Sequence, residues 1–191
     1  MQSTSTELLN ALRDPQNHLA WCAFCARYGP VLHAFARKLG LNDTDAQDVS
    51  QETFIAFARA HQVGRYNARK GRLRSWLFRI VQNKVHDLQR RRVHDPGPLD
   101  PPTGERAFDE GQQAQIWEEE WRQALIRTCL QLVRRDVVES TFAAFENITL
   151  KERSPDEVAA ELGMSRAAVI KANQRVLSRM RELHRILDVE W

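Results

Sequence analysis

The chain has 191 residues, enough for one medium domain or two small ones, and its 42% hydrophobic fraction allows a packed core. Three cysteines, an odd and low number, argue against a disulfide scaffold, and the chain has no run of roughly 18 apolar residues that could cross a membrane. The N-terminus lacks the basic segment and apolar run of a secretory signal, so a cytoplasmic protein is expected, and the formal net charge of +3 identifies no partner by itself.

Charge is distributed unevenly along the chain. Residues 1–92 hold 15 Lys or Arg and 7 Asp or Glu, residues 93–121 hold 1 and 8, and residues 122–191 hold 12 and 10. Within residues 65–92, ten basic residues stand against a single acid, Asp87. A block this basic is typical of a surface that contacts phosphates, and the alternative is a solvated helical face.

Helical periodicity begins near the N-terminus. It predicts helices at Glu7–Leu12, His18–Tyr28 and Val31–Leu39. Gly29-Pro30 is expected to separate the last two, with Pro30 in the first turn of the later helix, and Gly40 is expected to cap its end.

A CxxC formed by Cys22 and Cys25 lies in the second of these helices. It lacks a second CxxC or a nearby HxxxH, so no zinc site is expected, and a redox site would need a preceding strand. The three-residue spacing on an apolar helix face predicts two buried thiols instead.

An acidic amphipathic helix is predicted next, from a cap among residues 42–44 to about Ala60. Its core-facing stripe is Ala46, Val49, Thr53, Phe54 and Phe57. The opposite flank carries Asp45, Asp48, Gln51 and Glu52. An acidic face beside an apolar ridge suits a basic helical partner.

A loop at residues 64–71 and a long basic helix at residues 73–92 follow. The apolar stripe of this helix is Trp76, Leu77, Ile80, Val81, Val85 and Leu88. Trp76 is therefore expected in the core and not as a stacking platform. Arginines and aromatics together indicate a surface for phosphates and opened nucleic acid.

Composition changes at residues 94–111, which hold four of the seven prolines and three of the eight glycines. Such a stretch does not sustain a helix or a core and is interpreted as an interdomain linker. The helical pattern resumes at about Gln113, and a further helix is predicted at about residues 138–147.

The segment Ser154–Leu187 has the pattern of a helix-turn-helix. Ser154 and Pro155 start the first helix, Gly163 allows the turn and Ser165 caps the second helix. Polar residues near the start of the second helix would face a major groove: Arg166, Lys171, Gln174 and Arg175. The alternative is a helical hairpin with a charged outer face.

Together these segments resemble bacterial RNA polymerase sigma factors of the extracytoplasmic-function class. DAQDVSQETF at residues 45–54 resembles the polymerase-docking helix of that family. RLRSWLFRIVQNKVHDLQRRR at residues 72–92 is similar to its promoter-melting and −10-reading segment, and residues 154–176 are similar to its −35-reading helix-turn-helix. The likeness covers about residues 10–92 and 113–187, in the family's order.

The resemblance implies roles for individual residues. The coiled-coil of the large catalytic polymerase subunit would be met by Asp45, Asp48, Gln51 and Glu52. The melted −10 strand and a flipped base would be held by Arg65, Tyr66, Asn67, Arg72, Arg74, Arg79, Asn83, Lys84, Asp87 and Arg90. The −35 duplex would be contacted by Ser165, Arg166, Lys171, Gln174 and Arg175. Ala172 stands where many members carry a basic residue, so the −35 sequence is not carried over.

The expected fold is all-α with two small helical domains. Residues 1–92 would form a sigma region 2-like bundle, residues 93–112 a flexible acidic linker, and residues 113–191 a region 4-like helix-turn-helix domain. The expected partners are core RNA polymerase, through its coiled-coil and flap, and promoter DNA, double- and single-stranded. An anti-sigma factor is a further candidate partner, although no residue of the sequence indicates a contact with one. No enzyme, cofactor or metal is expected, because no phosphate-binding glycine loop or ligand constellation is present.

Two other functions would account for part of this sequence. An autonomous helix-turn-helix regulator would leave the acidic helix and the basic segment unexplained. A nuclease would need carboxylates or histidines clustered around a metal, and the basic half shows none.

The acidic linker at residues 93–112 has two interpretations. The resemblance implies a displaceable mimic of nucleic acid in a polymerase channel, and the alternative is an ordinary solvated connection.

Overall fold

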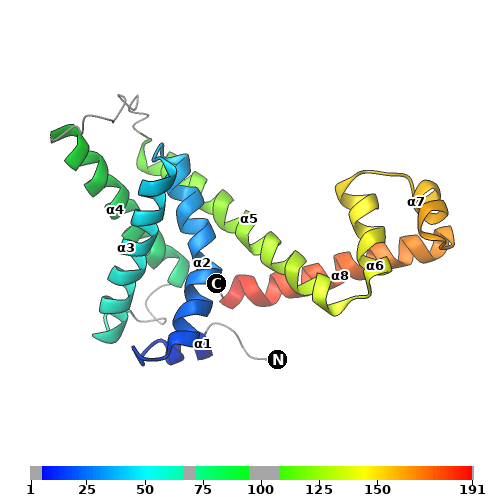
Figure 1. The fold of residues 1–191 in the computed structure, drawn as a ribbon, viewed down its shortest axis with the longest axis horizontal. Helices are drawn as coiled ribbons and strands as arrows, with labels where there is room; N and C mark the ends of the chain where they lie inside the picture. The colour runs from blue at the N-terminus through cyan, green and yellow to red at the C-terminus, as the bar shows by residue number, and fades with distance from the viewer. Residues whose placement is uncertain (1–5, 67–71, 95–107, 191) are drawn as a thin grey trace. The chain divides into compact units, whose positions relative to one another are not determined.

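In the computed structural model, residues 6–66, 72–94 and 108–190 are described. These residues are helical and contain no strand, which confirms the expected all-α fold (Figure 1). They divide into two compact units, one made essentially of Met1–Arg122 and one of Gln123–Val189, and each is described by itself.

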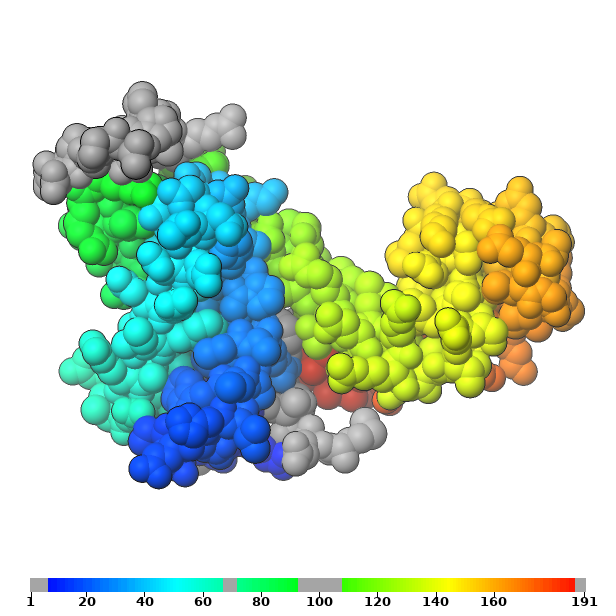
Figure 2. All heavy atoms as spheres, viewed as in Figure 1, coloured from blue at the N-terminus to red at the C-terminus, as the bar shows by residue number. Residues whose placement is uncertain are grey.

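The first unit is a helical bundle. Its helices are α1 (Thr6–Ala11), α2 (His18–Lys38), α3 (Asp43–Gln62), α4 (Leu73–His94) and the beginning of α5 (Glu110–Asp136). Figure 2 shows α2 (blue) and α3 (cyan) in contact along their length. Their shared core is aromatic, with Phe24, Tyr28, Phe35 and Phe57 fully buried. This core holds α2 and α3 against each other.

Helix α2 runs without interruption through Gly29 and Pro30, so the predicted break was wrong. Pro30 is exposed, and only its missing N–H is lost from the helix ladder. Tyr28 and Val31 are both buried, which shows that the apolar stripe continues across the dipeptide. Packing on both sides of Gly29-Pro30 therefore outweighs the local helix-breaking tendency.

Helix α3 begins where a capping residue was expected. Asn42 is the N-cap, and its side-chain oxygen accepts a hydrogen bond of 2.9 Å from the backbone N–H of Asp45. The preceding Gly40 has φ +92°, a left-handed conformation that favours glycine. The sharp turn between α2 and α3 follows from these two residues.

The first part of α5, up to Arg122, belongs to the N-terminal unit. Trp117 and Trp121 are 2% and 1% exposed. The ring of Trp117 lies 5.4 Å from that of Phe35 and 5.6 Å from that of Phe78, and Trp121 stacks on Tyr28 at 5.7 Å. The division between the units thus falls after Arg122, whereas the sequence-based boundary was placed at residue 113. Residues 95–107 of the expected linker lie outside the described residues.

The second unit contains the rest of α5 and four shorter or later elements. They are α6 (Glu139–Phe145), the π-helical turn η1 (Glu146–Leu150), α7 (Pro155–Leu162) and α8 (Arg166–Glu190). A small core of Ala144, Val158, Val169 and Ala172 joins α6, α7 and α8. The predicted helix at residues 138–147 therefore ends at Phe145 and continues as a π-helical turn.

The turn between α7 and α8 has the chemistry expected for a helix-turn-helix. Ser154 and Glu157 form a capping box, and Pro155 occupies the first turn of α7. Gly163 adopts φ +63°, the left-handed conformation that allows the sharp turn. The hydroxyl of Ser165 accepts a hydrogen bond of 3.2 Å from the N–H of Ala168 and so caps α8.

The two thiols of the CxxC differ from expectation. Cys22 is exposed and Cys25 is half-buried, so the prediction of two buried thiols was wrong. No helix in the described part of the chain is long and apolar enough to span a membrane.

Candidate nucleic-acid and partner interface

Helix α4 presents one line of polar side chains to solvent. Leu73, Leu77, Val81 and Val85 are buried and fix the inward face of the helix. On the outward face, Arg79, Asn83 and Arg90 are exposed, and Arg72, the residue just before the helix, is exposed as well. At 3.6 residues per turn, these four positions fall within about 20° of one line along the helix. Four of the predicted −10 residues therefore form a single stripe, called here the α4 stripe.

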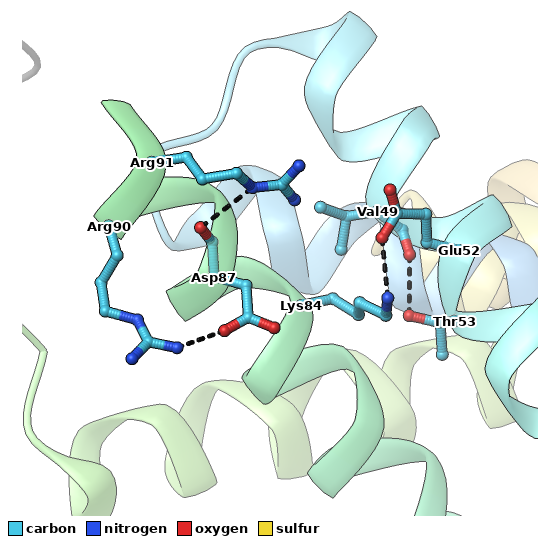
Figure 3. Close-up of polar contacts among 7 residues, drawn as sticks. All are labelled: Val49, Glu52, Thr53, Lys84, Asp87, Arg90 and Arg91. Atoms are coloured by element: carbon cyan, nitrogen blue, oxygen red, sulfur yellow. Dashed lines mark hydrogen bonds and ion pairs between the residues drawn. The ribbon is translucent and has the colours of Figure 1, made fainter. Parts of the chain in front are cut away.

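Cations on another side of α4 are held by carboxylates of α3. Lys84 Nζ lies 2.8 Å from Glu52 Oε2, and Arg92 pairs with Asp45 (Figure 3 shows the first pair). Two of the four predicted partner-binding residues on α3 are thus engaged within the bundle. Asp48 and Gln51 are exposed on the same flank, and Asp48 forms no ion pair with the described residues.

The Lys84 pairing changes the acidity of Glu52. Lys84 donates a hydrogen bond to the Glu52 carboxylate and adds its positive charge, and together these effects hold the pKa of Glu52 below its ordinary value of 4.5. A carboxyl group whose pKa is lowered by folding stabilises the folded chain when it is ionised. That contribution is present above pH 4.5 and is lost as the pH falls through the lowered pKa.

We expect Glu52→Gln to lower the thermal unfolding midpoint at pH 7, and the difference from wild type should shrink as the pH falls below 4.5 and the wild-type carboxyl takes up its proton. Both side chains are partly exposed, so the effect should not exceed about 1 kcal/mol. The control is Asp48→Asn, which removes an exposed carboxylate from the same helix. A Glu52→Gln difference that persists unchanged at low pH would contradict the assignment.

Asp87, the single acid of the basic block, is tied to neighbouring arginines (Figure 3). Its carboxylate pairs with Arg90, and its backbone carbonyl accepts a hydrogen bond of 3.3 Å from Nε of Arg91. Asp87 is half-buried and holds the Arg90 end of the α4 stripe, and its contact with the −10 strand stays a prediction.

Arg74 lies on a different side of α4 from the other predicted contacts. It is about 180° around the helix from Asn83. Its guanidinium pairs with Glu118 of α5, lies 5.5 Å from the ring centre of Trp121, and its side chain is only 17% exposed. The structure therefore places Arg74 between α4 and α5, and a role on the −10 strand stays a prediction.

Tyr66 ends the described part of the loop after α3 and lies in an aromatic cluster. Its ring centre is 5.1 Å from Trp76, 5.9 Å from His61 and 6.1 Å from Phe57. Partial burial raises the pKa of the Tyr66 phenol above its usual 10.0, so the hydroxyl remains a proton donor at neutral pH. Trp76 is half-buried, and Asn67 lies outside the described residues.

His61 was not predicted to take part in this cluster. It is buried, its ring stacks on Phe57 at 5.5 Å, and its Nε2 lies 2.7 Å from the carbonyl oxygen of Leu9. Because a carbonyl only accepts, Nε2 carries the proton. The contact joins α1 to the end of α3, a link between distant residues that no local pattern indicates.

The start of α8 carries the predicted −35 residues. Lys171, Gln174 and Arg175 are exposed, while Ala172 is buried and faces α7. Arg166 is exposed, with its Nε 3.3 Å from Asp156. Sequence reasoning missed Asn173, whose side chain accepts a 2.8 Å hydrogen bond from the Thr149 hydroxyl and fixes α8 against η1.

Comparisons with known proteins point to one family. Residues 24–94 match Sigma-70 region 2. The chain is 39% identical over 87 residues to RNA polymerase sigma factor CnrH of Cupriavidus metallidurans and 32% identical over 91 residues to ECF RNA polymerase sigma factor SigE of Mycolicibacterium smegmatis. It is 41% identical over 64 residues to RNA polymerase sigma factor NccH of Alcaligenes xylosoxydans xylosoxydans.

These matches are confined to part of each protein. They cover 45%, 48% and 34% of this chain, and 44%, 34% and 33% of CnrH, SigE and NccH, so the chain spans less than half the length of each relative. A solved structure of CnrH in complex with the cytosolic domain of CnrY aligns over 100% of both chains with 25% identity and a TM-score of 0.40.

Proposed function

We propose that the chain is a sigma factor of the extracytoplasmic-function class, which binds core RNA polymerase and directs it to promoters. The match of residues 24–94 to Sigma-70 region 2 and the similarity to CnrH, SigE and NccH support this proposal. The observation that supports this most directly is the acidic flank of α3 beside the exposed α4 stripe. One face suits a basic protein helix, and the next suits phosphates. The role requires binding and strand separation and involves no covalent chemistry.

Docking of polymerase is assigned to the flank of α3. Asp48 and Gln51 offer an exposed carboxylate and amide, and Ile55, which is 50% exposed, adds an apolar contact one turn further on. Such a face fits a basic helix of the polymerase coiled-coil, because opposite charges steer the encounter and the apolar residue contributes buried area.

Promoter melting is assigned to the α4 stripe together with the loop before α4. Arg72, Arg79 and Arg90 would neutralise phosphates of the separated strand, and Asn83 offers an amide that can hydrogen-bond to a base edge. The half-buried ring of Tyr66, which packs on Trp76, supplies an aromatic surface in the loop before α4. Capture of unstacked bases there would favour the open complex over the duplex.

We expect Asn83→Ala to impair open-complex formation more than initial promoter binding, because the amide would meet only separated bases. Permanganate footprinting of unpaired thymines, compared with a gel-shift assay on closed duplex, measures the two steps. Ser75→Ala, an exposed substitution on the same helix, is the matched control. An equal loss at both steps would remove Asn83 from the melting role.

Recognition of the −35 duplex is assigned to the start of α8. Arg175 is exposed and forms no ion pair with the described residues, so its guanidinium is available for paired hydrogen bonds to a guanine. Lys171 would contact phosphate, which positions the helix without selecting a sequence.

Arg175→Ala should weaken binding to promoters with an intact −35 element by about 1–3 kcal/mol and relax preference at one base pair. Fluorescence anisotropy on a set of single-base −35 variants, with polymerase holoenzyme, measures both effects. Arg181→Ala, exposed later on α8, serves as the control. A uniform loss over all variants would identify a phosphate contact instead of a base contact.

A further inference from the structure

The π-helical turn η1 is bonded to both helices of the helix-turn-helix. The hydroxyl of Thr149 donates a hydrogen bond of 2.8 Å to Oδ1 of Asn173 in α8. Two residues earlier along the turn, Oδ1 of Asn147 accepts a hydrogen bond of 3.0 Å from Nη1 of Arg153, and the same nitrogen pairs with Glu161 of α7. One residue of η1 therefore fixes α7 through Arg153, and another fixes α8 directly.

Asn147 anchors this turn in the second unit. It is 5% exposed, and both polar atoms of its side chain are bonded, since Nδ2 donates a hydrogen bond of 2.9 Å to the carbonyl oxygen of Ala143. The N–H of Lys151 donates over 3.0 Å to the carbonyl oxygen of Glu146, the five-residue step of a π-helix. A buried amide with its partners in place holds a polar network rigid, so Thr149 is presented to α8 from a fixed turn.

A second contact holds α8 from the other side. Nη2 of Arg179 lies 3.1 Å and its Nε 3.4 Å from Oδ2 of Asp136, the last residue of α5. At about 100° per residue, Asn173 and Arg179 lie on opposite sides of the buried line through Val169 and Val176, each about 60° away from it. The two contacts therefore oppose rotation of α8 about its own axis in both directions.

The exposed residues assigned to the duplex lie opposite this buried line. Lys171 and Gln174 are each about 150° around α8 from it. A helix with its side chains is about 10–12 Å across, so a rotation of about 20° moves a side-chain tip by about 2 Å. A hydrogen bond to a base edge tolerates far less, because its donor–acceptor distance lies within about 2.7–3.2 Å. A flexible lysine can still follow a phosphate, so rotation of α8 would reduce sequence preference before it reduced affinity.

We propose that Thr149 and Asn173 are positioning residues for sequence recognition by α8, and that η1 fixes the rotation at which this helix meets a DNA duplex. In this role Oδ1 of Asn173 serves the Thr149 hydroxyl and not a base. The contact between Arg179 and Asp136 sets the same rotation from the other edge of the helix. The inference rests on the proposed function, because it concerns the −35 recognition assigned to α8.

The test is Thr149→Val, which removes the hydroxyl and keeps a β-branched side chain of similar size. Sequence preference is the ratio of the Kd for single-base −35 variants to the Kd for the parent promoter, measured by fluorescence anisotropy with the full chain assembled on core RNA polymerase. We expect this ratio to fall by about 2- to 10-fold, the effect of one neutral hydrogen bond. Affinity for a duplex without a −35 element should stay as in wild type.

Three further variants separate positioning from a general loss of stability. Thr149→Ser keeps the hydroxyl and should restore the wild-type ratio. Thr128→Val makes the same substitution in the same unit, where the lost hydrogen bond of 3.0 Å to the carbonyl oxygen of Ala124 lies within α5, and it should not change the ratio. Asn173→Ala should lower the ratio as far as Thr149→Val, and the double variant should lower it no further, because the two residues act as a pair.

Wild-type preference in Thr149→Val, with helicity confirmed by circular dichroism, would overturn the inference. An equal loss of affinity for every duplex would overturn it as well. So would a loss at one base pair in Asn173→Ala that Thr149→Val does not share, because Asn173 would then read a base itself. A wild-type chain with no preference among the −35 variants would remove the −35 role from the proposed function, and this inference with it.

Discussion

Replacing Trp117 by Ala should destabilise the N-terminal unit by about 3–5 kcal/mol, the range measured when a buried Trp or Phe is truncated in a core. Trp117 is 2% exposed and contacts Phe35 of α2 and Phe78 of α4. Its loss would leave a cavity between three helices. Since the ring packs against both α2 and α4, the whole N-terminal unit should loosen.

Hydrogen exchange measured by mass spectrometry on the full chain reports this effect locally. Peptides from α2 and α4 should lose about two orders of magnitude or more of protection, whereas peptides from α7 and α8 should keep theirs. Ile126→Ala, a truncation on the same helix at a side chain that is 40% exposed, is the control and should change little. A loss below about 1 kcal/mol for Trp117→Ala would favour a domain boundary at residue 113 over one after Arg122.

Asp48→Arg should abolish stable binding to core RNA polymerase. Asp48 is exposed on the α3 flank and forms no ion pair with the described residues, so the substitution leaves the bundle intact. Against a basic coiled-coil it places like charges together, which costs several kcal/mol and should lower affinity by about 100-fold or more. Glu52 would be a poorer choice, because its replacement also releases Lys84.

Affinity for core polymerase should be measured with a labelled full-length chain. Glu7→Arg makes the same charge change at an exposed position of α1 and should bind like wild type. Exchange protection of α3 should be equal in all three proteins. Wild-type affinity in Asp48→Arg would remove the α3 flank from the docking surface.

Local chemistry made the helix-turn-helix predictable. The capping box at Ser154, the left-handed Gly163 and the cap at Ser165 each depend on residues within a few positions along the chain. The same holds for the start of α3 at Asn42. Periodicity likewise identified the buried line of α4, so the outward α4 stripe followed as its complement.

Contacts between distant residues were not predictable in the same way. Arg74 was grouped with the other arginines of its block, yet Glu118, far along the chain, pairs with it. Asp45 and Glu52 were recognised as an acidic flank, but not as partners of Arg92 and Lys84. The break predicted at Gly29-Pro30 failed for the related reason that packing of α2 against α3 outweighs local propensity.

The acidic stretch near α5 shows how composition can mislead. Its many acids and prolines predicted a linker up to residue 112, but α5 begins at Glu110 and buries Trp117 and Trp121 in the N-terminal unit. The spacing of four between Trp117 and Trp121 puts both rings on one face of a helix and was the available signal. Which helices those rings would meet could not be read from the chain alone.

The most direct test of the proposed role is run-off transcription with purified core polymerase on a pool of genomic promoter fragments, with and without this protein. The proposal predicts discrete new start sites that require the protein, are lost in Asp48→Arg and share a −10 and a −35 element. Unchanged transcripts, together with tight binding of the isolated protein to duplex DNA, would contradict it and identify an autonomous regulator instead.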